Sequence, residues 1–398
     1  MILSDISTIY DCPHSTAPDE GEGYPLIRTP NVGKGRLILD GVHRVCKETY
    51  DIRNKRAVPR ENDIIFAREA PAGNAAVITK GQYVCLGQRT VLIRPDSNVV
   101  NSHYLVYYLL APRQQVKLLG YAHGSTVGHV NIPDIANLPV ELPTMEKQVQ
   151  IAEIIENYDN LIEVNNKRIK TLEQIAENLY KEWFVRFRFP EHVNVEFVNG
   201  TPKGWKYVAF DKIFSYERGV SYSSEEIECD EGNNLINLKN IQGFGGFRRD
   251  GTKKYNGQYK PSQVVKYNDL IMGVTDMTQD RRTVGAVALV PNMQGVISAD
   301  LIKLSSPINN LFSYCMFRWG FYSTYISQFG NGANVIHLKP GTIRNAKILI
   351  PTEEVIAVFV KQVEPLFDQI ESLYARIDNL TSQRDLLMPR LMGGKLEV

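Results

Sequence analysis

The 398-residue sequence has few cysteines, and it has no long apolar run. The five cysteines are far apart: Cys12, Cys46, Cys85, Cys229 and Cys315. The absence of any Cys-x-x-Cys pair argues against a disulfide framework and a zinc ribbon, and favours a reducing cytoplasm. The longest apolar run is residues 104–111, whereas a membrane span needs about 20 residues. The first residues are not a basic stretch followed by an apolar one, so we expect no secretion signal.

An excess of charge of either sign is also missing. Lys and Arg number 45 against 44 Asp and Glu, for a net charge of +1, which excludes a uniformly basic nucleic-acid coat and an acidic disordered tail. Hydrophobic residues make up 43% and charged residues 22%, as is ordinary for a folded globular chain. The length predicts two or three domains, at roughly 150 residues per domain.

Several catalytic motifs are absent. No Pro-Pro occurs, which excludes the Asn-Pro-Pro-aromatic pocket of amino-methyltransferases. No lysine follows an acidic residue by two positions, as the common metal-dependent nuclease motif requires. Neither Gly-Lys-Ser/Thr nor His-Glu-x-x-His is present, and Arg248 stands where a dinucleotide-binding motif would place its third glycine. We therefore expect no catalytic residue, no metal site and no cofactor of the chain's own.

An internal repeat is present. Residues 124–144 and 332–352 align without a gap at an offset of 208, with seven of 21 positions identical, among them His129 with His337. Further upstream, Leu26-Ile27 answers Leu235-Ile236, and 63–65 answers 269–271. A period near 208 is too long for a solenoid and indicates a duplicated domain. The counterpart of residues 202–205 would precede Met1, so the first copy is expected to start a few residues late.

A long helix is expected after each copy, because apolar residues recur there at spacings of three and four. The expected helix-pair packing positions are Ile151, Ile155, Tyr158, Ile162, Ile169, Leu172, Leu179, Phe359, Val363, Leu366, Ile370, Leu373, Ile377, Leu380 and Leu387. This stripe favours coiled-coil packing over an ordinary core helix, with Arg384 interrupting it at the slot of Ala176. Chain connectivity then predicts an antiparallel pair. Short alternating runs at 75–79, 84–93, 286–290 and 296–304 predict strands, and 104–117 and 311–329 predict shorter helices.

The predicted fold is therefore mixed α+β, with a pseudo-two-fold repeat. Its expected parts are a first globular domain, a spacer helix, a second globular domain and a second spacer helix, at 1–143, 144–186, 187–351 and 352–398. The net charges are +1 for residues 1–143, −3 for 144–184, +6 for 185–351 and −3 for 352–398. Basic charge thus gathers where loops could lie on DNA, although a merely solvated surface is the alternative for any one cluster.

Basic and amide side chains in these loops are the candidates for phosphate and base contacts. They are Asn31, Lys34, Arg36, Arg44, Arg53, Lys55, Arg56, Arg68, Ser125, Thr126, Asn240, Gln242, Arg248, Arg249, Lys253, Lys254, Thr275, Asp276, Arg281, Arg282 and Asn334. Arg68 and Asp276 could equally be internal ion-pair partners. His129 and His337 lack neighbours at ligand spacing, so a shared turn or packing role is favoured for them over a metal or catalytic role.

Six stretches stand out within the order domain, helix, domain, helix: 124–143, Glu146-Lys147-Gln148, 151–155, 165–167, 179–190 and 384–396. In these stretches the chain resembles the DNA specificity subunits of Type I restriction-modification systems. The resemblance implies two target recognition domains that each read one half of a bipartite asymmetric DNA site. It also implies helices that set the spacing and dock modification subunits, expected in two copies, and through them restriction subunits.

In such systems S-adenosylmethionine, ATP and Mg²⁺ are used by the partner subunits, so the resemblance implies a non-catalytic chain. One departure is that Glu-x-Gln at 146–148 becomes Glu354-Val355-Ile356 in the second copy, so the two helix starts are expected to contact partners differently. Two alternatives stay open. One is a coiled-coil scaffold that does not bind DNA sequence-specifically, and the other is a self-sufficient nuclease or methylase with an unfamiliar site.

Overall fold

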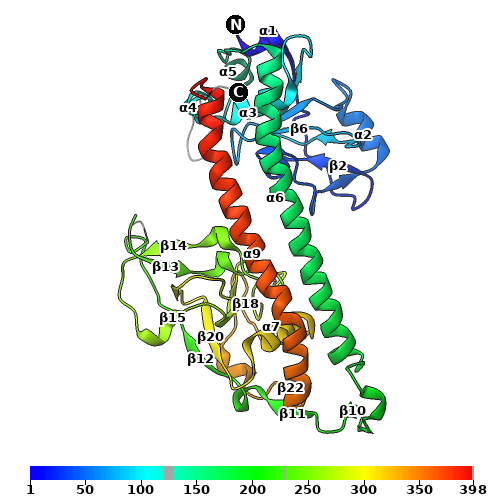
Figure 1. Cartoon of the computed structure of the whole chain (residues 1–398), viewed down its shortest axis with the longest axis vertical. Coiled ribbons are helices and arrows are strands. Elements are labelled where there is room, and N and C mark those ends of the chain that lie inside the picture. Colours follow the sequence, from blue (N-terminus) through cyan, green and yellow to red (C-terminus); the bar gives the residue numbers. More distant parts are fainter. Residues whose placement is uncertain (121–128, 228–229, 397–398) are drawn as a thin grey trace. The chain divides into compact units, whose positions relative to one another are not determined.

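The computed structural model describes residues 1–120, 129–227 and 230–396, which divide into two compact units. Unit 1 comprises Met1–Val164 and Arg376–Val398, and unit 2 comprises Asn165–Ala375. The divisions fall inside two long helices, α6 (Met145–Tyr180) and α9 (Glu353–Met392), shown in green and in orange to red in Figure 1. Each long helix therefore contributes one part to each unit. The mixed fold class and the two long helices are confirmed, whereas the expected domain boundaries stay a prediction.

Unit 1 is built on a five-stranded sheet with the order β1-β8-β5-β6-β3. Its strands are β1 (Ser7–Asp11), β8 (Thr90–Pro95), β5 (Ile64–Ala67), β6 (Ala75–Val77) and β3 (Gly35–Arg36). All four residues of β5 are buried. Such a continuous apolar run is typical of a strand covered on both faces.

A second sheet of unit 1 has the order β4-β2-β7, with β4 (Arg44–Val45), β2 (Tyr24–Ile27) and β7 (Cys85–Leu86). The helices outside α6 and α9 are α1 (Leu3–Ile6), α2 (Lys47–Arg53), α3 (Ser102–Leu110), α4 (Pro112–Gly120) and α5 (Ile132–Ala136). Helix α3 is buried along nearly all of its length and packs on β6 and β3.

Unit 2 repeats this plan. One sheet has the order β12-β20-β16-β18, with β12 (Ser215–Arg218), β20 (Leu301–Ser305), β16 (Leu270–Gly273) and β18 (Val287–Leu289). The other has the order β14-β13-β19-β15, with β14 (Lys253–Tyr255), β13 (Asn233–Ile236), β19 (Gly295–Ile297) and β15 (Val264–Val265).

Smaller elements complete unit 2. The paired strands are β11 (Lys206–Ala209) with β22 (Lys347–Ile350), β17 (Thr275–Asp276) with β21 (Ile336–His337), and β9 (Phe197–Val198) with β10 (Thr201–Pro202). The helices are α7 (Asn310–Trp319) and α8 (Tyr322–Ser327). Helix α6 continues as a π-helix over Lys181–Val185, whose Trp183 and Phe184 are buried in the aromatic core of unit 2.

The duplication extends to single hydrogen bonds. In each unit a strand pairs antiparallel with one neighbour and parallel with another: β2 with β4 and β7, β13 with β14 and β19. Asn101 caps α3 by accepting from the Tyr104 N–H, and Asn309, 208 positions later, caps α7 in the same way. Gly73 (φ +92°) and Gly285 (φ +76°) close equivalent turns in the left-handed region that favours glycine.

Several expected elements are divided in the structure. Residues 104–117 form α3 and α4, because Pro112 begins a new helix and cannot donate to the preceding turn. Residues 311–329 form α7 and α8, separated at Gly320 and Phe321, where the φ of Phe321 is +65°. The runs at 84–93 and 296–304 each contain two strands joined by a turn. In every case a local turn divides one expected element into two.

The two long helices contact each other inside each unit. In unit 1, Asp159 of α6 pairs with Arg384 of α9, and Ile151 and Leu391 belong to one apolar core, so the two segments run in opposite directions. In unit 2, Tyr180 packs edge-on against Phe359. The expected packing positions are all buried or half-buried. Those that are nearly fully buried are Ile151, Ile155, Ile169, Phe359, Val363, Ile370 and Leu373.

Candidate nucleic-acid interface

Two asparagines shared by the repeat have structural roles. Asn31 accepts a hydrogen bond from the Arg28 N–H and donates to the carbonyl of Ile38. Asn240 accepts from the Asn237 N–H and donates to the carbonyl of Arg248. Both side chains are buried, and each stabilises an equivalent short turn in its own unit. Identity between copies here reflects a common fold, and we therefore remove both from the candidate interface.

Three charged candidates are also held internally. Arg53 is 5% exposed and donates to the carbonyls of Leu86, Ser15 and Pro13. Arg68 donates to the carbonyl of Val130, and Asp276 accepts from the backbone N–H groups of Thr278 and Thr283. Because their hydrogen-bonding groups already have partners in the fold, the prediction is revised: these residues shape loops and do not present themselves to a ligand. The internal alternative for Arg68 and Asp276 is the one that the geometry favours.

The remaining candidates differ in how far their side chains are exposed to solvent. Exposed candidates are Lys34, Lys55, Arg56, Gln242, Arg248, Lys254, Arg282 and Asn334. Half-buried candidates are Arg36, Arg44, Arg249, Lys253 and Arg281. Thr275 is buried, and Ser125 and Thr126 lie outside the described residues.

In unit 1 a charged cluster surrounds Arg68. His129 contacts Arg68 through Nε2 at 2.6 Å and Glu69 through Nδ1 at 2.5 Å. Arg89, whose side chain is 61% exposed, pairs with Glu69, and Arg56 lies 3.5 Å from Asp11. Sequence reasoning missed Arg89, which follows β7 in a turn with a φ of +64°. His129 thus has a packing role that ties β5 to the segment before α5.

In unit 2 the equivalent place holds two loops, 276–282 and 331–335, which we call the unit 2 loop pair. Strands β17 and β21 join the loops at their base, and Gln279 donates to the carbonyl of Ala333. Arg281 donates to the carbonyls of Ser327 and Gln328, which leaves Met277 (76% exposed) and Arg282 (58%) facing outward.

The first loop of this pair also has a length signal in the sequence. The turn 274–284 is six residues longer than its counterpart 68–72, and both are closed by the same glycine hydrogen bond. Met277 and Gln279 are functional candidates that sequence reasoning missed, and this inserted length is the signal that could have found them. Hydrogen bonds at its base and an exposed, polar and basic tip suit the loop to reading base edges.

Each unit fastens a basic loop to its own long helix through an Arg–Glu ion pair. Arg36 of β3 pairs with Glu163 of α6 and donates to Asn160 at 2.5 Å. Arg249 pairs with Glu371 of α9 at 2.6 Å, and its guanidinium lies 4.3 Å from the ring centroid of Tyr374. These two arginines are therefore engaged by the helices and position the loops that contain them.

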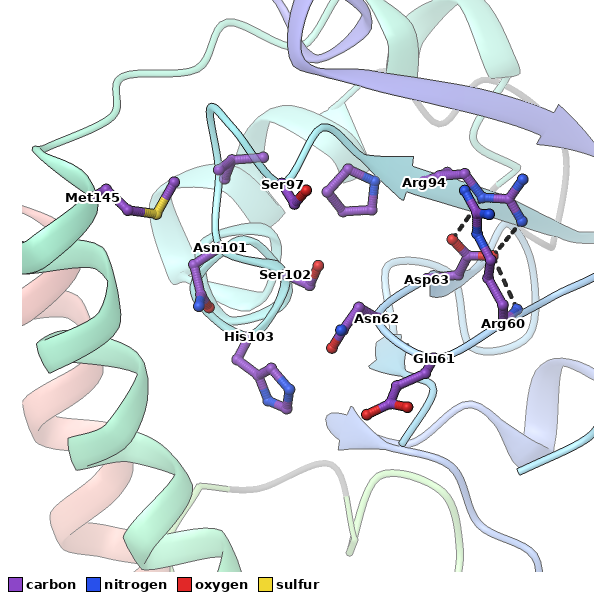
Figure 2. Close-up of a pocket in the computed structure, with 12 residues that line it drawn as sticks. Arg60, Glu61, Asn62, Asp63, Arg94, Ser97, Asn101, Ser102, His103 and Met145 are labelled. Carbon is purple, nitrogen blue, oxygen red and sulfur yellow. Dashed lines mark hydrogen bonds and ion pairs between the residues drawn. The ribbon is translucent and has the colours of Figure 1, made fainter. Parts of the chain in front are cut away.

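A hollow of about 310 Å³ lies in unit 1, between the turn at residues 60–63 and the start of α3. Figure 2 shows the side chains that line it. Asp63 accepts from the guanidinium of Arg94 and from the Arg60 N–H, so its carboxylate is fully engaged. The repeat-equivalent Asp269 accepts from Lys303 and from the Lys266 N–H in the same manner. Both aspartates therefore stabilise the turn that leads into a strand, and Asp63 is not available as a catalytic acid in this hollow.

The described residues contain neither a metal-ligand cluster nor a membrane-spanning helix. Among residues 1–120, 129–227 and 230–396, no three His, Cys, Asp or Glu side chains come together as a metal site would require. His337 is exposed at the end of β21. No helix in the part of the chain that the structure describes is long and apolar enough to cross a membrane.

A duplicated two-unit fold with polar and basic loops braced on a pair of long helices defines a class of sequence-reading adaptor. Residues 2–174 match the family model described as the Type I restriction modification DNA specificity domain. The chain is 27% identical over 371 residues to the Type I restriction enzyme MjaIX specificity subunit of Methanocaldococcus jannaschii, covering 91% of this chain and 83% of that protein. It is 23% identical over 408 residues to the HindI specificity subunit of Haemophilus influenzae, covering 86% and 88%.

The fold is similar to a solved structure as well. The crystal structure of a Type I restriction-modification system S subunit from M. genitalium covers 98% of this chain, with 95% of that chain aligned, 14% identity and a TM-score of 0.55. The resemblance to Type I specificity subunits that the sequence predicted is confirmed. The family match lies in residues 2–174, and the similarity to the two specificity subunits extends over 86–91% of this chain.

Proposed function

We propose that this chain reads a bipartite DNA site, with unit 1 reading one half and unit 2 the other. The observation that carries the proposal is the duplication: two topologically equivalent units each place polar and basic loops on a long helix through an Arg–Glu pair. Duplicated readers whose loops differ in length and sequence suit an asymmetric target.

In this proposal each unit makes two kinds of contact with DNA, one with phosphates and one with base edges. Exposed basic side chains such as Arg56 and Arg282 neutralise phosphates, and loop-tip groups such as Gln279 and Asn334 read base edges. Arginine pairs well with guanine and amides pair well with adenine, so the unit 2 loop pair has the chemistry for direct readout.

The helices α6 and α9 set the spacing between the half-sites and dock the modification subunits in this proposal. Two copies of the modification subunit follow from the duplication, and restriction subunits join through them. Catalysis then resides in the partners, which use S-adenosylmethionine for methylation and ATP and Mg²⁺ for restriction. The acidic balance of the helix segments supports a protein-facing role there.

The test is reconstitution with a cognate modification subunit, followed by mapping of methylated bases. We expect methylation at a two-part sequence that requires this chain, and DNA affinity that falls with added salt in proportion to the phosphates contacted. A chain that binds the modification subunit but shows no sequence preference on DNA is a scaffold, and the proposal then fails. Turnover by the purified chain with DNA, Mg²⁺ and S-adenosylmethionine alone would establish a self-sufficient enzyme instead.

A further inference from the structure

The returning part of α9 packs on unit 1 mainly through apolar side chains. Leu391 is 2% exposed, and Leu387 and Met388 lie against the same core as Ile151 and Ile155 of α6. Residues at spacings of three and four form a seam that repeats along both helices. A purely apolar seam of this kind fits more than one register, because shifting one helix by a heptad presents similar side chains again.

A buried charged cluster interrupts this seam. Arg384 donates from Nη1 to Oδ1 of Asp159 at 2.6 Å, and the hydroxyl of Tyr107 donates to Oδ2 of the same carboxylate at 2.6 Å. The side chain of Asp159 is 5% exposed and that of Arg384 is 15% exposed. Burial alone lowers the pKa of Arg384, but the hydrogen bond and charge of Asp159 outweigh it and raise that pKa.

The packing around this cluster leaves little room for a shift. Gly35 of β3, with a φ of +90°, lies directly over it. A Cβ at Gly35 would be 3.1 Å from Cε1 of Tyr107 and 3.2 Å from Oδ2 of Asp159. Strand β3, helix α3 and both long helices therefore meet at the carboxylate of Asp159.

The second copy has no such cluster at the equivalent positions. At the offset of 208, Asp159 corresponds to Phe367, Tyr107 to Cys315 and Arg384 to Ala176. Phe367 packs edge-on against Tyr314 at 5.7 Å between ring centroids, and Ala176 is fully buried. Unit 2 has a different, partly buried ion pair, between Arg318 of α7 and Glu173 of α6, and Arg318 also contacts Tyr314. The charge at Asp159 and Arg384 is therefore not a requirement of the repeated fold at these two positions.

Buried ion pairs add little net stability over apolar side chains of similar volume, because desolvation offsets their attraction. Their best-attested contribution is to select one register, since a slipped helix leaves buried charge unpaired. We propose that Tyr107, Asp159 and Arg384 form a register latch that fixes which turn of α9 packs on unit 1. This second part rests on the proposed function: the latch also restricts the gap lengths between the two DNA half-sites that the chain accepts.

The register is tested without DNA. Spin labels at Glu153 of α6 and Arg390 of α9, both exposed and both in unit 1, report the distance between the helices in the full chain. We expect one narrow distance in the parent protein and a broad or multiple distribution in the apolar variant D159L/R384L. R384K, which keeps the charge, should retain the narrow distance. A narrow, unshifted distance in D159L/R384L, with a folded circular dichroism spectrum, would overturn the latch.

The spacing is tested on DNA. Duplexes in which the gap between half-sites is changed by one to three base pairs are methylated with the cognate modification subunit. We expect D159L/R384L to raise the methylation rate on duplexes of altered gap length at least about tenfold, relative to the rate on the native gap length. The control E177A/K181A removes a half-buried ion pair at the junction of α6 and the π-helix, and it should leave this ratio unchanged. Unchanged spacer selectivity despite a broadened distance overturns the spacing role. If the parent protein and its modification subunit methylate no two-part site, the proposed function is rejected. The distance between the spin labels still tests the register latch in that case.

Discussion

Glu163 and Glu371 occupy equivalent positions of the two long helices, 208 residues apart, and each receives an arginine from its own unit. The arginines come from different places in the loop: Arg36 lies in β3, and Arg249 lies just after the equivalent strand position. The helix side of the contact has thus been kept through the duplication while the loop side has changed. Such a clamp allows recognition loops to vary without losing their attachment.

Removing either glutamate should loosen only its own clamp. The pairs are partly exposed, so E163Q and E371Q should each lower the free energy of unfolding by no more than about 1 kcal/mol. Hydrogen exchange should rise at residues 33–37 in E163Q and at 247–251 in E371Q. The control is E177Q, which changes the half-buried Glu177–Lys181 ion pair. Equal changes in both loops from a single variant would show that the clamps do not act independently.

The shared asparagines should matter for stability and not for DNA sequence. N31A and N240A each leave buried backbone groups without a partner, so each should lower the free energy of unfolding by about 1–3 kcal/mol, measured by urea titration. N334A, at an exposed position, should leave stability unchanged. A changed methylation sequence in folded N240A would return that residue to the interface.

Asp276 should make stability depend on acid pH. Burial raises the pKa of its carboxyl, but hydrogen bonds from Thr283 and Thr278 outweigh this, and the pKa lies below its usual value of 3.8. Its stabilisation is therefore complete above about pH 4 to 5 and is lost as the pH falls through the folded-state pKa. D276N should lower stability by a constant amount from pH 7 to 5, with the difference shrinking below about pH 4. A difference that persists unchanged at pH 2.5 would contradict the assignment.

The tip of the unit 2 loop pair should control one half of the DNA site. Q279A and R282A remove exposed groups that have no core role, so the variants should fold normally and relax base preference in a single half-site by about 1–3 kcal/mol per lost contact. Methylation of a randomised-site library is the readout. K181A, in the π-helix that follows α6, is the matched control. Relaxation in both halves would disprove the assignment of one half to unit 2.

The described cysteines should react unequally. Cys46 is exposed, whereas Cys12, Cys85 and Cys315 are buried. Burial raises the pKa of Cys85 to about 11, so it stays protonated at pH 8. In a C229S background, because Cys229 lies outside the described residues, iodoacetamide should modify Cys46 alone within minutes, as read by mass spectrometry. Rapid modification of Cys85 in the folded chain would contradict its buried position.

The duplication, the long helices and the family could all be predicted from the sequence, because repeated identities and apolar spacing are local signals. The role of each polar residue could not. Asn31 and Asn240 have the chemistry of base readers, yet they brace turns. Their identity in both copies points to the shared fold, since readers of different bases should differ.

For other residues, burial of the side chain explains the difference between the sequence prediction and the structure. The sequence predicts Arg53 to be a surface cation because it lies in a basic stretch. In the structure its guanidinium donates to carbonyls of a neighbouring strand and loop. Gln148, expected to mark a partner contact, is 1% exposed and ties α6 to the carbonyls of Val99 and Pro143. The contacts of Arg53 with Leu86 and Ser15 and of Gln148 with Val99 span 33 to 49 residues of chain. Such contacts have no local signature, which is why sequence reasoning assigned these side chains to the outside.

Domain exchange tests the central claim most directly. Residues 1–143 would be replaced by the corresponding domain of a specificity subunit with a different target, and the methylated sequence would be mapped with the same modification subunit. We predict that one half of the site changes, while the other half and the gap between the halves stay the same. A change in both halves, or an unchanged site, would contradict the account of two independent readers on a common spacer.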